Sequence, residues 1–142
     1  MLPPVSGTTW DGLPVAPEPP FACAVHVWRA AATGSEWLLL HRAHAEDEVE
    51  WAWTPPAGAR LPGERAEDCA RRELREEAGL DTEPRLVGGG ECAWFVAQAP
   101  AGWEPLLDDE HDAHAWLPLE EACARCAPAV VADGLRAAAA AG

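Results

Sequence analysis

The chain has 142 residues, of which 49% are hydrophobic, and its formal net charge at pH 7 is −14. This length suits one domain with one core, and so hydrophobic a composition excludes wholesale disorder. The charge would repel nucleic acid polymers and anionic membranes, so we expect neither as a partner. An anionic substrate would need a cation to screen its approach, and a divalent metal is the obvious candidate.

Residues 1–20 carry six prolines, which predicts an irregular N-terminal strap ahead of a domain over 21–142. This stretch lacks the basic start and apolar centre of a signal peptide. The odd number of cysteines, five, fits free thiols in a reducing compartment. We therefore expect a cytoplasmic protein, and no apolar run approaches the roughly 18 residues of a membrane span.

The first predicted elements are strands over residues 21–29 and 37–42, joined by a turn. The second strand should be buried by its run of leucines. An acidic loop follows. His41 and His44 stand at the end of the second strand, where they could face the mouth of a substrate site, but we expect them to lie at the surface. WTPP then forms a proline-stiffened approach to the most charged part of the chain.

A helix is predicted from about Ala66 to Ala78, with Gly79 as its C-terminal stop. Apolar residues recur on one face of it and can pack against a sheet. These residues are Cys69, Ala70, Leu74 and Ala78.

Beyond this helix, RLVGG at 85–89 and ECAWFVAQ at 91–98 have the composition of strands. A loop over 100–112 leads to a short strand at 113–119. A helix opens at LEEACARCA, and Pro128 starts or kinks its continuation to about residue 140. Strands and helices in this order, without internal repeats, predict a single domain of the α/β or α+β class.

Three glutamates of the predicted helix, Glu73, Glu76 and Glu77, are spaced three and four residues apart and share a face. Adjacent carboxylates repel one another, unless a hard cation such as Mg²⁺ or Mn²⁺ collects their oxygens. The alternative is a solvated surface helix whose charges pair with one another. Arginines alternate with the acids, and Arg72 can hold the carboxylates in place.

The spacing around these acids decides between the two interpretations. Gly58 is followed after five residues by Glu64, and seven residues later by Arg72-Glu73-Leu74. One further residue separates this triplet from Glu76-Glu77, and another separates that pair from Gly79-Leu80. This pattern resembles the Nudix box at every defined position, so the chain is identified as a member of the Nudix hydrolases.

The resemblance implies a mixed β-sheet between helices, with the box as a loop-helix-loop. It implies hydrolysis of a diphosphate linkage in a nucleoside diphosphate joined to another group, with Mg²⁺ or Mn²⁺ as cofactor. Such a substrate is a small nucleotide or diphosphate, and the protein would be a monomer or homodimer.

The resemblance also implies roles for the box residues. Glu73, Glu76, Glu77 and the carbonyl of Ala57 would bind the metal, and one of the glutamates or a loop acid would act as general base. Arg72 would orient Glu73 and Glu64. Gly58, Glu64 and Gly79 would support the site.

Two flanking segments resemble asymmetrical dinucleoside tetraphosphate hydrolases, namely WTPPAG at 53–58 and EHDAHAWLPLEEA at 110–122. Two departures count against that substrate. Ala57 replaces the lysine of those enzymes, and the stretch after the box lacks their basic and tyrosine residues. Nucleoside triphosphates and nucleotide sugars therefore stay open as alternatives.

Residues outside the box complete the candidate site. Three box carboxylates under-coordinate two or more hard cations, so we expect a further acid from the 100–112 loop. Glu110 is chosen because the flanking resemblance places a glutamate before histidine there. Its neighbours Asp108, Asp109 and Asp112 could serve instead. Candidates for substrate contact are Arg42, Trp94, Trp103, His111 and His114.

Other functions compete with hydrolysis. A degenerate Nudix module would bind a nucleotide without cleaving it, but such modules usually lose box glutamates and this box is complete. An isomerase or a DNA-repair glycosylase subdomain would need a larger chain or partner domains. Cys123 and Cys126 stand one helical turn apart, without a second pair to complete a zinc site, so we expect them to pack in the core.

Overall fold

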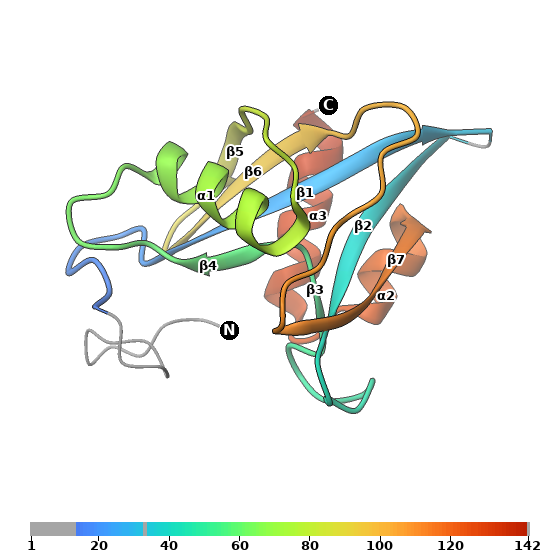
Figure 1. Ribbon diagram of the computed structural model, residues 1–142, viewed down its shortest axis with the longest axis horizontal. Coiled ribbons are helices and arrows are strands. Elements are labelled where there is room, and N and C mark those ends of the chain that lie inside the picture. Colours follow the sequence, from blue (N-terminus) through green and yellow to red (C-terminus); the bar gives the residue numbers. More distant parts are fainter. Residues whose placement is uncertain (1–13, 33, 142) are drawn as a thin grey trace.

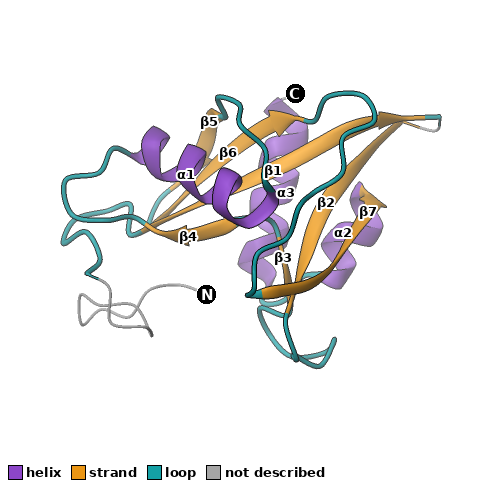
Figure 2. Cartoon of the chain, viewed as in Figure 1, coloured by secondary structure: helices purple, strands orange, loops and turns teal. Residues whose placement is uncertain are grey.

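The structure is a computed structural model that describes residues 14–32 and 34–141; most of the expected N-terminal strap, residues 1–13, lies outside them. A seven-stranded sheet carries α1 on one face and α2 and α3 on the other (Figures 1 and 2). This arrangement confirms the expected mixed sheet between helices. The elements are β1 (Ala22–Ala31), β2 (Gly34–Arg42), β3 (Trp53–Thr54), β4 (Ala57–Ala59), α1 (Ala66–Ala78), β5 (Arg85–Gly89), β6 (Cys92–Gln98), β7 (His111–Pro118), α2 (Leu119–Arg125) and α3 (Ala129–Ala141).

Strand β1 is the centre of the sheet. The main strand order is β3-β2-β1-β6-β5, while β4 pairs with β1 and β7 pairs with β2. Among the described strand pairs, β1 and β6 alone run parallel, in a register that sets Ala24 opposite Trp94; the other pairs are antiparallel. The sequence predicts the five longer strands but not β3 and β4, because two or three residues beside prolines carry no readable alternation.

Two clusters of buried side chains cover the two faces of the sheet. On the α1 side, Val25 and Val27 of β1 meet a helix face that contains all four residues predicted to pack. That face consists of Cys69, Ala70, Leu74 and Ala78, each 0% exposed. Because side chains alternate along a strand, Ala22, Ala24 and His26 point to the opposite face, toward α3.

The second cluster lies between the sheet and the two C-terminal helices. Cys123 and Cys126 are buried in it, as expected for packing residues. His41 is also buried, at 8% exposure, so its expected surface position is wrong. Its ring packs against Trp53 at a centroid distance of 4.7 Å, a contact that depends on the short, unpredicted β3.

Arg60 connects residues 16–20 of the N-terminal segment with the loop before α1 through hydrogen bonds. Its guanidinium donates to the carbonyls of Glu18 and Pro20, and also to the carbonyl of Glu64. The backbone N–H of Ala16 donates to the carbonyl of Arg60 at 2.7 Å. Among the described helices, none is both long and apolar enough to cross a membrane.

Candidate active site

Helix α1 turns two of its three box glutamates toward the sheet. Glu73 and Glu77, four residues apart, are only 7% and 8% exposed. The backbone N–H of Ala57 in β4 donates to Oε1 of Glu77 at 2.9 Å. The Glu73 carboxylate lies so close to Gly58 that a Cβ at that position would come within 2.2 Å of its Oε1. Glycine is therefore required at 58 for Glu73 to reach this place.

Arg72 connects the acids of the helix with the loop before it. Its Nε and Nη2 donate to the two carboxylate oxygens of Glu64 at 2.8 and 2.9 Å. Its Nη1 donates to Glu73 at 2.8 Å and, more weakly, to Glu76 at 3.4 Å. Both contacts expected of Arg72 from the sequence are thus present, and such two-pronged charged bonds fix geometry as well as charge.

Gly79 ends α1 and brings the following loop to the site. Its φ of +75° is the left-handed conformation that favours glycine, and its N–H caps the carbonyl of Arg75. A Cβ on Gly79 would lie 3.1 Å from the Cβ of Leu106, whose N–H donates to the carbonyl of Ala78 at 2.8 Å. This close approach places the loop that contains Asp108 over the end of the helix.

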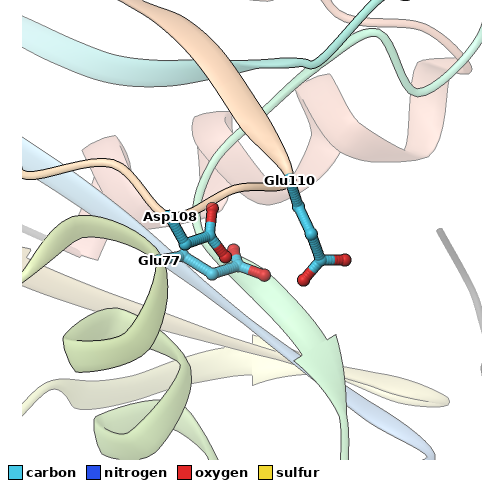
Figure 3. Close-up of side chains that lie close together, drawn as sticks. All are labelled: Glu77, Asp108 and Glu110. Atoms are coloured by element: carbon cyan, nitrogen blue, oxygen red, sulfur yellow. The ribbon is translucent and has the colours of Figure 1, made fainter.

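Three carboxylates from two distant segments meet at this point. Figure 3 shows Glu77 of α1 beside Asp108 and Glu110 of the loop before β7. Each offers an oxygen, and these three oxygens all lie within 4.8 Å of one another. Only oxygen ligands are offered here, which suits a hard divalent cation such as Mg²⁺, Mn²⁺ or Ca²⁺.

The raised pKa of Glu77 also fits a site for a divalent cation. Burial raises the pKa of Glu77 well above its usual value, and the neighbouring charges of Glu73, Asp108 and Glu110 raise it further. Burial also raises the pKa of Glu73, although Arg72 opposes the shift. A divalent cation among these oxygens would compensate charges that the described residues leave only partly balanced.

Contacts with the end of β2 and the residues after it hold Glu110 and Asp112 in position. The N–H of Ala43 donates to the carbonyl of Glu110 at 2.8 Å, and the N–H of His44 donates to Oδ2 of Asp112 at 3.2 Å. Nδ1 of His41 lies 2.6 Å from Oδ1 of Asp112. Asp112, one of the alternatives to Glu110, is thus engaged with β2.

His111, a candidate for substrate contact, has a different neighbour in this structure. Its Nδ1 lies 2.7 Å from Oδ1 of Asp108, so it holds one of the three clustered acids. From the sequence, Asp108 was expected only as an alternative to Glu110 for the further acid of the site. The sequence signal for Asp108 was the run of acidic residues in LLDDEHD. Such a run does not show which of its side chains point into the site.

The remaining candidates for substrate contact do not gather in one place. Trp103 packs on the α1 side of the sheet, edge-on to Trp116 at 6.2 Å, and His114 lies 3.3 Å from Glu104. Trp94 instead lines a pocket with residues of α3. Arg42 is exposed at the end of β2.

Glu76 of the box and Ala57, directly before the box, differ in their surroundings. Glu76 is 55% exposed at its side chain, and Arg72 is its ion-pair partner among the residues that the structure describes. Ala57 is held through its N–H by Glu77, whereas a metal would use its carbonyl. Their roles as metal ligands stay predictions.

Comparisons with known protein sequences agree with one another. The sequence profile of the NUDIX domain matches residues 20–136. The asymmetrical bis(5'-nucleosyl)-tetraphosphatase of Mus musculus is 37% identical over 103 residues, covering 62% of this chain and 67% of that protein. The protein of the same name from Sus scrofa is 34% identical over 106 residues, covering 64% and 69%.

Solved structures agree as well. A binary complex of a C. elegans Ap4A hydrolase superposes with a TM-score of 0.68 at 26% identity, covering 84% of this chain and 94% of that one. The E. coli dihydroneopterin triphosphate pyrophosphohydrolase superposes with a TM-score of 0.70, covering 86% and 95%, but at 19% identity it supports the fold alone. The resemblances expected from the box and its flanks are confirmed.

Proposed function

The chain belongs to the Nudix family, and from this premise we propose that it is a pyrophosphohydrolase that cleaves dinucleoside tetraphosphates with Mg²⁺ or Mn²⁺. Hydrolysis of phosphoric anhydride bonds in nucleotides follows from the family and from the relatives. The named substrate and the choice of metal are the proposed part. The substrate proposal rests on relatives of 34% to 37% identity that carry this activity in their name.

One observation carries the proposed metal dependence, namely the meeting of Glu77, Asp108 and Glu110 within 4.8 Å. The net charge of the protein is −14, and three of its acidic residues gather at this one point, where a tetraphosphate would be repelled. Divalent cations held there would neutralise phosphate oxygens and lower the pKa of the attacking water.

Other residues of the chain position the carboxylates for this reaction. Arg72 fixes Glu73 and Glu64, so the carboxylates need not reorganise during the reaction. Glu77 is held by the N–H of Ala57. Glu110 is exposed, and its carboxylate already lies in the cluster with Glu77 and Asp108, so it suits a metal ligand on the solvent side of the site. We propose Glu77, Asp108 and Glu110 of the cluster, together with Glu73 and Glu76, as the candidates for metal ligands and general base.

A substrate panel tests the proposal. Diadenosine tetraphosphate, a nucleoside triphosphate and a nucleotide sugar are each offered with Mg²⁺ and with Mn²⁺, and products are separated by ion-pair chromatography. We expect the highest kcat/KM on the tetraphosphate, with AMP and ATP as products because the relatives are asymmetrical in name. A higher kcat/KM on either alternative would transfer the assignment to that substrate.

The panel also separates an enzyme from a nucleotide-binding module without activity. The complete box favours hydrolysis, since its acids and Arg72 are all in contact or clustered. Nucleotide binding without turnover of any offered substrate, with either metal, would contradict the proposed activity.

A further inference from the structure

Arg60 is a buried positive charge outside the acid cluster, in the loop between β4 and α1. The residue is 6% exposed. Its ion-pair partner among the described residues is Glu18, at 3.0 Å, whose side chain is 60% exposed. An exposed carboxylate compensates little of the cost of burying an arginine. The ion pair alone therefore does not explain why an arginine occupies this place.

Backbone carbonyls from two segments accept the other hydrogen bonds of Arg60. Its Nε donates to the carbonyl of Pro20 at 2.7 Å, and its Nη2 donates to the carbonyl of Glu18 at 2.8 Å. Its Nη1 donates to the carbonyl of Glu64, in the loop that lies beside the N-terminal segment (Figure 1). A guanidinium is planar and holds its donors in fixed directions. Arg60 therefore sets the position of the Glu64 backbone relative to residues 18–20.

The N-terminal segment is itself fixed to the body of the protein. Val15 and Ala16 are buried, and the N–H of Ala16 donates to the carbonyl of Arg60. The N–H of Arg60 donates to the carbonyl of Phe21 at 2.9 Å, directly before β1. These contacts make residues 15–21 a firm support for the Arg60 side chain.

Glu64 is held by its side chain as well as by its backbone. Its N–H donates to the carbonyl of Leu61 at 3.0 Å, and its Oε1 accepts the N–H of Leu61 at 3.0 Å. Burial acts to raise the pKa of Glu64, but the hydrogen bonds from Arg72 and from the Leu61 N–H hold that pKa below its usual value. The carboxylate is therefore charged at neutral pH and accepts two nitrogens of Arg72.

Arg72 transmits the position of Glu64 to the metal site. One guanidinium makes both contacts, since Nε and Nη2 donate to Glu64 while Nη1 donates to Glu73. Because these donors are rigidly connected, a displaced Glu64 carboxylate would also move Nη1 away from Glu73. The positions of Arg60, Glu64, Arg72 and Glu73 are thus coupled.

We propose that Arg60 is a positioning residue of the hydrolysis, which fixes Glu64 and thereby the orientation of Arg72 and Glu73. The inference rests on the proposed function, in which Glu73 is a candidate metal ligand or general base. It gives the N-terminal segment a role in catalysis, because residues 18–20 supply carbonyls against which Arg60 is held. Arg60 occupies none of the positions that define the Nudix box.

Arginine side-chain resonances test this coupling in metal-free protein, without turnover. The Nε–H of Arg72 donates to Glu64, so its ¹⁵N–¹H signal should exchange slowly with water in wild type. Arg60→Lys keeps the charge, but one ammonium cannot reproduce the fixed donors. We expect the Arg72 Nε–H to shift in this variant and to exchange about tenfold faster. Glu18→Gln is the control, because it keeps the carbonyls and removes only an exposed charge, and should leave the signal unchanged.

Kinetics on the best substrate of the panel test the role in catalysis. Arg60→Lys should lower kcat about five- to tenfold and change KM less than about twofold, because a small misplacement acts mainly on the transition state. Ala138→Gly is the control for stability. It weakens α3 in the buried cluster on the opposite face of the sheet and should leave kcat unchanged.

A double-mutant cycle with Glu64→Gln identifies the route of the effect. If Arg60 acts through Glu64, Arg60→Lys should lower kcat by less than about twofold when Glu64→Gln is already present. A purely structural role of Arg60 would instead give the same loss of kcat with and without Glu64→Gln.

Several results would overturn the inference. They are an unchanged Arg72 Nε–H signal in folded Arg60→Lys, an unchanged kcat, and an equal loss of kcat in both backgrounds of the cycle. If Arg60→Lys does not fold, wild type decides: exchange of the Nε–H groups of Arg60 and Arg72 should rise in parallel with urea, and different dependences would contradict the coupling. Absence of hydrolysis together with a shifted Arg72 signal would refute the proposed activity and not the coupling.

Discussion

Replacing Glu77 by Gln should stabilise the metal-free protein while it abolishes activity. Glu77 is 8% exposed, and burial together with nearby carboxylates raises its pKa above the usual 4.5. As pH rises through 4.5, the unfolded chain releases this proton while the folded chain still holds it, so the free energy of unfolding falls. At neutral pH the metal-free wild type carries that penalty in full or in part. Gln keeps an oxygen for the Ala57 N–H but has no charge.

The size of the effect follows from the size of the shift. Each unit by which the folded pKa exceeds the unfolded one corresponds to about 1.4 kcal/mol. For a chain of this length, that is roughly 3–6 °C in Tm per unit. A cation acts in the opposite direction, since a metal at about 100 times its Kd stabilises wild type by about 2.7 kcal/mol. The order of the two Tm values should therefore reverse when metal is added.

Thermal unfolding followed by circular dichroism tests this reversal. In EDTA near pH 7.5, Glu77→Gln should melt several degrees above wild type, and the difference should vanish near pH 4. With Mg²⁺, wild type should gain stability and the variant little. Glu76→Gln is the matched control, because that side chain is 55% exposed, and its Tm in EDTA should stay within about 2 °C of wild type. A lower Tm for Glu77→Gln than for wild type in EDTA would refute the reasoning.

Three further predictions concern other residues. Arg72→Ala should lower the free energy of unfolding by about 3 kcal/mol in urea titrations, because Glu73 loses its partner while it stays buried; a loss below about 1 kcal/mol would contradict this. Glu110→Gln should lower kcat about tenfold with a smaller change in KM, and the exposed neighbour variant Asp109→Asn should match wild type; equal kcat in both would remove Glu110 from the site. His26 has a pKa lowered to about 3 by burial, so the unfolded chain binds a proton that the folded chain does not between about pH 6.5 and 3. Stability should fall there as pH is lowered, by up to about 1.4 kcal/mol per pH unit, and His26→Leu should show a correspondingly smaller slope; identical slopes would contradict a neutral buried His26.

The longer elements could be predicted because their signals are local. Helix α1 runs from Ala66 to Ala78 as expected, since an apolar face and a stop at Gly79 fix both its packing and its end. The short strands β3 and β4 could not be predicted, because pairing with β2 and β1 creates them rather than their own residues. The buried position of His41 was missed for the same reason, as it depends on Trp53 of β3.

The candidate site was predictable where spacing along one helix brings residues together. The contacts of Arg72 with Glu64 and Glu73 follow from the box pattern. The meeting of Glu77 with Glu110 was expected only through resemblance, and the inward turn of Asp108 depends on how Leu106 lies over Gly79.

The central claim is hydrolysis that depends on a divalent metal at the acid cluster of Glu77, Asp108 and Glu110. It is tested most directly by adding Mn²⁺ stepwise to metal-stripped protein, with bound Mn²⁺ measured by electron paramagnetic resonance and tetraphosphate cleavage measured in the same samples. We predict no cleavage without metal and a rate that rises with bound Mn²⁺, with both lost or strongly weakened in Glu77→Gln. Full cleavage by the metal-stripped protein, or unchanged Mn²⁺ binding in Glu77→Gln, would contradict the account.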